Sequence, residues 1–398
     1  MAYEKSSREP RDIAGTILAA VGATFLIFGL LWWSFGIKTL VKFPARFERK
    51  VSFEGKYTRF SMTHGIQKLS EPPKVSYAGV IRFRSEDASY TKKAAVVLES
   101  IKVQDALGEP GVLTSLESRY VFDRIDARGI KSRLSTSNGK VVDRTGAVYP
   151  VFPVGTRKDS YEVFCPDTDS SFPANFKGES KRFNLGVFLF KGGFKERPLV
   201  DSSLEARRLP RWTTFGSLKR ELAGAGVPVD EMVKAAYTRL TEKEKATLDS
   251  FSDSMKIRLD YLADVEWEAA VEPVSGTVVE VIKSRMKIYV NPDPSALMPL
   301  LQIFASRSDD PIVSKYMSQV EQQNVLEPKK LCAIEEKWTS GSVEKIVKEA
   351  HSRKNTIIII KKYVLYGSIL FGAALLFAGF LIKREKHHHQ LQKEEISA

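Results

Sequence analysis

The sequence predicts an α+β membrane protein, in which an antiparallel, β-rich central domain with a helical insert is flanked by N-terminal and C-terminal transmembrane helices. Two uncharged, apolar stretches lie near the ends of the chain, at 13–37 and 363–382. The chain between them is polar and contains short runs in which apolar and polar residues alternate, as they do in half-buried strands. Within 38–340, the section at about 215–262 has the spacing of helices. The central domain is therefore placed at 38–340.

The first apolar stretch is long enough to cross a bilayer, because a hydrocarbon core about 30 Å thick needs about 20 helical residues. Trp32 and Trp33 lie near its end, where amphipathic rings favour the membrane interface. A cleaved signal peptide is the alternative, but its apolar core is normally shorter and is followed by a small-residue cleavage site, which is missing after Trp33. We therefore expect a tail at 1–12 and a transmembrane helix at 13–37.

The second apolar stretch is bracketed by cations, with Lys361 and Lys362 before it and Lys383 and Arg384 after it. Such residues sit at the two headgroup layers of a bilayer. The preceding segment, 341–362, has apolar residues at helical spacing, so a membrane-proximal helix is expected to run into the span. A transmembrane helix at 363–382 and a basic tail at 383–398 complete the plan.

Strand patterns predict that the central domain is built from antiparallel hairpins. The runs 79–84 and 94–103 alternate or are rich in β-branched residues, and a polar turn separates them. The strongest hairpin pattern comes late, where 266–271 and 277–282 flank the turn 272–276, which contains Pro273 and Gly276. Further strands are expected at 118–124 and 183–190.

The helical insert at about 215–262 contains two predicted helices. The run 229–237 has helical spacing, and Thr241 with Glu244 forms the pattern of a capping box that opens a second helix, expected to continue as far as Leu259. An insert of this kind either covers one face of the sheet or forms a lid.

The net charge of +13 does not predict a nucleic-acid partner, because many of the cations lie beside the two spans and no nucleic-acid-binding fingerprint is present. Cations at these positions suit anionic lipid headgroups, so the expected partner is the lipid bilayer. No Asn-X-Ser/Thr triplet occurs in the chain. This favours a prokaryotic envelope or a cytosolic domain over a eukaryotic cell surface.

Residues that would carry enzyme chemistry are scarce. Outside the triplet 387–389, the histidines are His64 and His351, and the chain has no P-loop, dinucleotide fingerprint or nucleophile elbow. The acidic pairs Asp167/Asp169 and Asp309/Asp310 are interpreted as turn residues, since no calcium-loop spacing surrounds them. We therefore expect no enzyme, no cofactor and no metal site.

Aromatic residues crowd into a short part of the central domain. Packing in a β-rich core is one interpretation, and an apolar pocket for a lipid is the other. The candidate pocket residues are Phe152, Tyr161, Phe164, Phe172, Phe176, Phe188 and Phe190. The two cysteines, Cys165 and Cys332, would form one disulfide in an oxidising compartment, and two separate buried thiols are the alternative.

The order and spacing of several segments resemble a prokaryotic family, best known from actinobacteria, whose members are described as a domain of unknown function or as PorA-family porins. These segments are 120–124, 149–156, 161–164, 173–179, 271–276 and 342–350. The chain departs from the family at 164–167, where Trp-Asp is usual, and in its longer helical insert. The resemblance implies that both termini lie in the cytoplasm and that the central domain is extracytoplasmic.

A pore does not follow from this resemblance, since two spanning helices cannot enclose one and no long series of amphipathic strands is present. The two-anchor plan is also similar to that of class B scavenger receptors, which handle lipid, although this is a likeness of architecture alone. The leading hypothesis is a non-enzymatic cell-envelope protein that binds a hydrophobic ligand or an envelope partner. A scaffold that assembles with itself or with a surface layer is the alternative, and an unrecognised envelope enzyme is the third.

Overall fold

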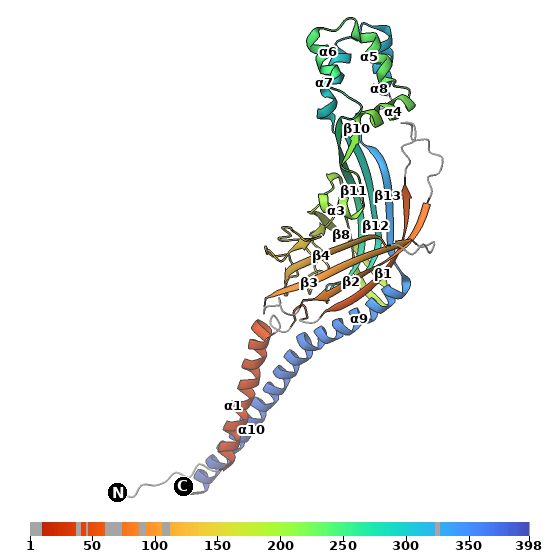
Figure 1. The fold of residues 1–398 in the computed structure, drawn as a ribbon. Coiled ribbons are helices and arrows are strands. Elements are labelled where there is room, and N and C mark those ends of the chain that lie inside the picture. Colours follow the sequence, from red (N-terminus) through yellow and green to blue (C-terminus); the bar gives the residue numbers. More distant parts are fainter. Residues whose placement is uncertain are drawn as a thin grey trace.

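The structure, a computed structural model, describes residues 10–36, 41–44, 47–59, 74–86, 93–105, 112–322 and 327–397. Two long helices lie at one end, a curved antiparallel sheet forms the middle and a group of short helices occupies the far end (Figure 1). The α+β class with an antiparallel, β-rich central domain is confirmed.

The two predicted spans are both helical. The first consists of α1, Pro10–Leu31, and a short π-helical segment, Trp32–Gly36. The second begins outside the apolar stretch with α9, Ser340–Ile358, and continues through the π-helical segment Ile359–Tyr363 into α10, Val364–Ser397. By length and composition, 13–36 and 340–384 contain apolar helical stretches sufficient to cross a bilayer. Residues 1–9 of the expected N-terminal tail lie outside the described residues.

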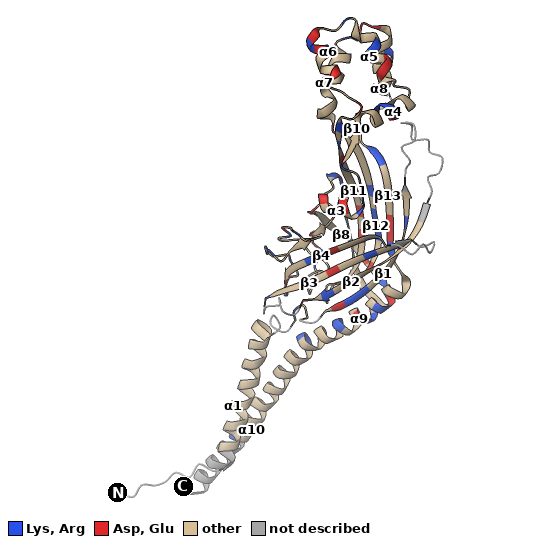
Figure 2. Ribbon diagram, viewed as in Figure 1, with Lys and Arg blue, Asp and Glu red and all other residues tan. Residues whose placement is uncertain are grey.

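Glycines bring α1 and α10 into close contact along their length. A Cβ atom at Gly22 would lie 2.7 Å from the carbonyl oxygen of Gly372, and one at Gly379 would lie 2.7 Å from that of Gly15. Small residues at such positions let two helix backbones approach in a lipid environment. Figure 2 shows these two helices almost entirely tan where they run side by side, with charged residues on α9, the strands and the distal helices. The two anchors therefore form one pair of closely packed helices.

The sheet has the strand order β6-β5-β4-β3-β2-β1-β13-β12-β11-β9-β8-β7, and every neighbouring pair is antiparallel. Its strands are β1 Glu48–Arg59, β2 Lys74–Ser85, β3 Ala94–Asp105, β4 Val112–Asp123, β5 Thr136–Ser137, β6 Lys140–Val141, β7 Tyr161–Cys165, β8 Ser170–Arg182, β9 Leu185–Pro198, β11 Lys256–Glu272, β12 Thr277–Pro292 and β13 Lys329–Trp338. The predicted hairpins are confirmed as β2–β3 and β11–β12. Part of the turn expected between β2 and β3, 87–92, lies outside the described residues.

Isolated bridges link β7, at one end of the strand order, to β4, near the other end, so that the sheet curves around a lumen. Val148 pairs with Val163 of β7 and also with Arg128, whose neighbour Gly129 pairs with Phe122 of β4. Register shifts in β11, between Glu268 and Ala269 and again before Val271, add curvature. The side chains on the concave face of the sheet therefore surround a lumen.

Short helices cover the end of the sheet that lies far from the anchors (Figure 1). We call them the apical helices: α4 Phe215–Gly224, α5 Val229–Tyr237, α6 Glu242–Asp249, α7 Pro294–Ala305 and α8 Pro311–Gln322. They share an apolar core of their own, to which β11 contributes Ile257. Two smaller elements, α3 Asp201–Ala206 and β10 Trp212–Thr214, precede them in the chain.

The predicted insert at 215–262 was too long at its C-terminal end. Its last helix ends at Asp249, and β11 begins at Lys256. In the segment after Lys256, the side chains of Ile257 and Tyr261 are buried whereas Lys256 and Arg258 are exposed, which is the period of a strand. Pairing with β12 stabilises this strand and overrides the helical spacing of the apolar residues.

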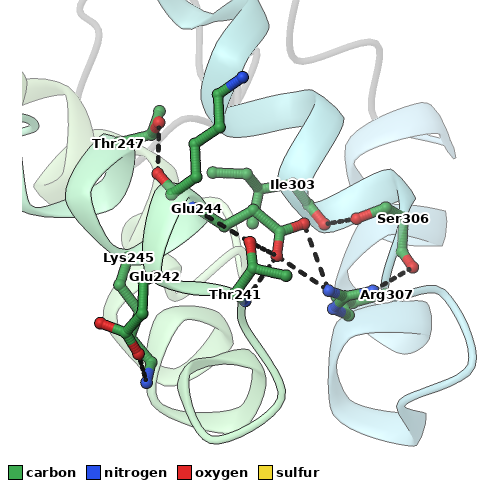
Figure 3. A network of polar contacts seen from close by, with 9 residues as sticks. Thr241, Glu242, Glu244, Lys245, Thr247, Ile303, Ser306 and Arg307 are labelled. Carbon is green, nitrogen blue, oxygen red and sulfur yellow. Dashed lines mark hydrogen bonds and ion pairs between the residues drawn. The ribbon is translucent and has the colours of Figure 1, made fainter.

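The predicted capping box is present and also joins two apical helices. Thr241 accepts a hydrogen bond from the Glu244 backbone N–H, and Glu244 accepts one of 2.8 Å from the Thr241 backbone N–H. Nη2 of Arg307, just after α7, lies 3.0 Å from Oε2 of the same Glu244 (Figure 3). The pKa of Glu244 is lowered, first by the hydrogen bond from the Thr241 backbone. One carboxylate thus caps α6 and ties it to α7.

Candidate functional site

The lumen contains two chambers that follow one another from the anchors towards the apical helices. The membrane-proximal chamber has a cavity volume of about 210 Å³ and lies near the end of β13 that leads into α9. The distal chamber has a volume of about 360 Å³ and lies nearer the apical helices. Each greatly exceeds the roughly 10–15 Å³ that one water molecule requires.

Large apolar and aromatic side chains line most of the membrane-proximal chamber. They come from both halves of the sheet and from the 148–152 segment that joins its edges. The principal ones are Phe53, Ile81, Phe83, Phe152, Phe164, Phe172, Val265, Trp267, Val281, Met286, Ile334 and Trp338. Within this lining, the rings of Phe152 and Trp267 are stacked, with centroids 6.5 Å apart.

The distal chamber continues the same apolar lining. Its wall includes Tyr57, Val103, Leu116, Leu209, Ile288 and Cys332. Phe53, Ile81, Ile101, Pro166 and Ile334 line both chambers. The two spaces are therefore adjacent parts of one apolar lumen.

Three charged residues also line both chambers: Asp167, Arg207 and Glu336. We call them the polar collar. They come from distant parts of the chain, since Asp167 lies in the turn after β7, Arg207 follows α3 and Glu336 lies on β13. An apolar lumen with a few convergent polar groups is the usual composition of a ligand site.

Arg207 and Asp167 form the centre of the collar. Nη2 of Arg207 donates a 2.8 Å hydrogen bond to Oδ1 of Asp167, which also accepts one of 2.5 Å from Ser203. Burial lowers the pKa of Arg207, but the charge and hydrogen bond of Asp167 outweigh burial, so the pKa is raised overall. Arg207 therefore carries a positive charge that Asp167 balances. Within the described residues, Nη1 of Arg207 makes no hydrogen bond, although its side chain is 19% exposed.

Glu336 forms the other side of the collar. It accepts a 2.8 Å hydrogen bond at Oε1 from the hydroxyl of Tyr77. Burial raises the pKa of Glu336, against the lowering effects of Tyr77 and of the Arg207 charge. Among the described residues, its second oxygen, Oε2, has no hydrogen-bond partner.

A second buried carboxylate lies behind the chamber wall. Glu99 accepts hydrogen bonds of 2.7 Å from Tyr120 and 2.5 Å from Tyr149, and the Arg144 guanidinium lies 4.1 Å from the centroid of the Tyr120 ring. Burial raises the pKa of Glu99. Tyr149 borders the membrane-proximal chamber, so this network holds the 148–152 segment that joins the edges of the sheet.

The seven predicted pocket residues occupy three different environments. Phe152, Phe164 and Phe172 line the membrane-proximal chamber. Tyr161 and Phe190 pack behind Phe152 in the same apolar cluster. The other two, Phe176 and Phe188, contact each other with ring centroids 5.4 Å apart, and Nζ of Lys158 lies within 6 Å of both rings.

The two cysteines are both buried, and each borders a different chamber, Cys165 the membrane-proximal one and Cys332 the distal one. The structure has no disulfide bond between these two residues. Burial raises the pKa of the Cys165 thiol to about 12. Pairing of the two in an oxidising compartment stays a prediction.

Sequence reasoning missed the collar and the half of the lining that comes from β1, β2 and β13. Asp167 was interpreted as a turn residue, which it is, but its carboxylate also binds Arg207. A signal for Glu336 exists, since period-two alternation places it on the same face of β13 as Cys332, Ile334 and Trp338. A charged residue on the apolar face of a strand marks a polar group inside the lumen.

The sequence matches the profile of the family described as Porin PorA over residues 14–381. No curated protein matches the chain. The matched region runs from the first apolar helix to the last turn of the second, and the two helices together with the family identify a membrane protein. The expected family resemblance is confirmed, and the chain belongs to the porin PorA family.

Proposed function

We propose that this protein is a cell-envelope membrane protein whose β-rich domain lies on the extracytoplasmic side and binds a hydrophobic ligand in its lumen. The observation that carries the proposal is the pair of apolar chambers enclosed by the curved sheet. Filling apolar space with hydrocarbon is favourable by about 25 cal/mol for each Å² of apolar surface removed from water.

The position of the lumen supports a lipid as the ligand. The membrane-proximal chamber extends to Arg49 and Trp338, next to the start of α9. Because α9 continues into the second span, this chamber lies at the end of the domain that faces the anchors. A hydrocarbon chain in the chamber would therefore lie near the bilayer.

The polarity of the sheet argues against the strands themselves as a membrane pore. A transmembrane barrel has an apolar outer band and, in porins, a polar interior. Here the inward face is apolar, whereas the opposite face of β1, β12 and β13 carries ion pairs such as Lys337 with Glu54 and Arg285 with Glu335. Such a surface suits water, and the lumen suits hydrocarbon.

The tryptophans provide a direct test of occupancy. Trp267 and Trp338 line the membrane-proximal chamber, while Trp32 and Trp33 lie in the first apolar helix and Trp212 is 54% exposed near the apical helices. Replacing Trp32, Trp33 and Trp212 with Phe leaves Trp267 and Trp338, so that the tryptophan fluorescence comes from the chamber alone. A dibrominated long-chain methyl ester, added to the delipidated full-length variant in detergent, should quench this fluorescence saturably.

A matched variant controls for binding elsewhere. Replacement of every tryptophan except Trp212 should give a protein whose fluorescence the same ester leaves unchanged. Equal quenching of both variants, or no saturable quenching of the chamber variant, would contradict the proposed function. The side of the membrane is tested separately by protease treatment of intact cells, where digestion of the central domain is expected and its protection would place the domain in the cytoplasm.

A further inference from the structure

The polar collar lies where the two mainly apolar chambers adjoin, and its position constrains the ligand. Hydrocarbon space lies on both sides of it, in the membrane-proximal and distal chambers. In a ligand that fills both chambers, the middle of the molecule, and not one end, must therefore lie beside the collar. Simple amphiphiles, such as fatty acids, carry their polar group at an end.

The charges of the collar select the kind of polar group. Arg207 is balanced by Asp167 at 2.8 Å, so this pair carries no net charge. The collar therefore offers no free positive charge, and an anionic group would meet the Asp167 and Glu336 carboxyl groups without one to offset the repulsion. A cation would meet Arg207. An added charge would also lose its hydration, which costs several kcal/mol in a buried site.

Two atoms of the collar can still form hydrogen bonds with a ligand. Within the described part of the chain, Nη1 of Arg207 and Oε2 of Glu336 have no hydrogen-bond partner. The first is a donor, and the second is an acceptor or, when protonated, a donor. An uncharged group with a carbonyl or hydroxyl oxygen satisfies these atoms without bringing a charge.

We propose that the collar recognises an uncharged, internal ester or hydroxyl group of a lipid that extends hydrocarbon into both chambers. This proposal rests on the proposed function, because it requires that the lumen takes up lipid. It names the ligand class as a neutral lipid with two apolar arms, and it assigns Arg207, Asp167 and Glu336 as the residues that determine specificity.

The test compares three probes of similar length in the variant that keeps only Trp267 and Trp338: a brominated wax ester with its ester in the middle, a brominated fatty acid and a brominated alkane. We expect the wax ester to bind about tenfold more tightly than the alkane, as one hydrogen bond to a charged group allows. The fatty acid should bind more weakly than the wax ester.

Two collar variants show whether the preference comes from these residues. Arg207→Met combined with Asp167→Asn removes both charges together, so that no unpaired charge stays buried. It should lose the preference for the ester while still binding the alkane, which also shows that the variant is folded. Glu336→Gln keeps a side chain that forms hydrogen bonds and adds no charge, so this variant should retain the preference.

Each contrary result has its own meaning. Equal affinity of the unaltered collar for the alkane and the wax ester would overturn the ligand class but leave lipid binding in place. Tighter binding of the fatty acid, lost in the Arg207→Met/Asp167→Asn variant, would overturn it in favour of anion recognition. If none of the three probes quenches Trp267 and Trp338, the proposed function itself fails.

Discussion

Nη2 of Arg49, on β1, lies 2.8 Å from Oε1 of Glu349, on α9, and Nε of the same guanidinium lies 3.3 Å from Oε2. The Arg49 side chain is only 4% exposed. This two-bond contact joins the first strand of the sheet to the helix that leads into the second span. Arg49 also borders the membrane-proximal chamber, so the contact fixes the base of the lumen relative to the anchors.

Removal of Glu349 should therefore destabilise the domain. Glu349→Ala leaves the buried guanidinium of Arg49 without its carboxylate, at a cost of about 2 kcal/mol, since water reaches this partly exposed site. The exposed pair Lys348–Glu344 lies on the same helix and supplies the control, because Glu344→Ala should cost less than about 0.5 kcal/mol. Unfolding midpoints from circular dichroism measure both, and equal shifts would contradict the assigned role of Arg49.

The buried carboxyl of Glu99 should make stability depend on pH. Burial raises its pKa in the folded state, so the folded protein holds this proton more strongly than the unfolded chain. The stability that the protonated Glu99 contributes to the folded state is present below the pKa of the unfolded chain. It is lost as the pH rises through the pKa of the folded state. Glu99→Gln stays uncharged and should flatten this part of the decline, which unfolding curves measured across a pH series will show. The same slope in both proteins would disprove the effect.

Tyr149→Phe provides an independent check on Glu99. The hydroxyl of Tyr149 donates to the carboxylate and lowers its pKa against the larger effect of burial. Its removal should raise the pKa of Glu99 further and extend the decline of stability to higher pH. The variant should also lose about 1 kcal/mol from the missing hydrogen bond. A decline that ends at a lower pH than in the unaltered protein would contradict this account.

Features with local signals were predictable from the sequence. The two apolar helices follow from uninterrupted hydrophobic runs, and the β11–β12 hairpin follows from alternation around a Pro- and Gly-containing turn. The cap at Thr241 follows from a four-residue pattern. Closure of the sheet has no such signal, because it depends on single residue pairs such as Val148 with Val163, which are distant from the strand patterns.

The lining of the lumen was predictable only in part, for a physical reason. Phe172 and Phe176 lie on the same face of β8, yet only Phe172 lines the chamber, since Phe176 is farther along the strand. Periodicity indicates on which face of the sheet a side chain lies, but not at which point along the strand the chamber lies. The strand of Glu336 was missed because the charged residues around 335–337 obscure its alternation.

The close packing of the two anchor helices should depend on Gly22. Gly22→Leu would place a side chain 2.7 Å from the Gly372 carbonyl oxygen, which forces α1 and α10 apart. Gly367→Leu is the control on α10, since a Cβ there meets no atom within 4 Å. A disulfide between Gly29→Cys and Ser368→Cys reports the helix contact, because the Cβ positions are 3.5 Å apart. Mass spectrometry of linked peptides should show loss of this bond with Gly22→Leu only.

The cap of α6 should control local opening among the apical helices. Thr241→Ala removes the side-chain oxygen that accepts from the Glu244 backbone N–H, a loss that typically costs about 1 kcal/mol. Since Glu244 also binds Arg307, the junction between α6 and α7 should loosen with the cap. Hydrogen exchange at the amides of α6 and at the end of α7 should therefore become faster.

Thr247→Ala is the matched control for Thr241→Ala. Thr247 lies on the same helix, but its hydroxyl only donates to the Lys243 carbonyl oxygen one turn earlier, a bond that does not stabilise a helix. Exchange in this variant should match that of the unaltered protein. If both threonine variants accelerate exchange equally, a general loss of helix stability explains the result better than the cap, and the link from Thr241 through Glu244 to Arg307 would have to be abandoned.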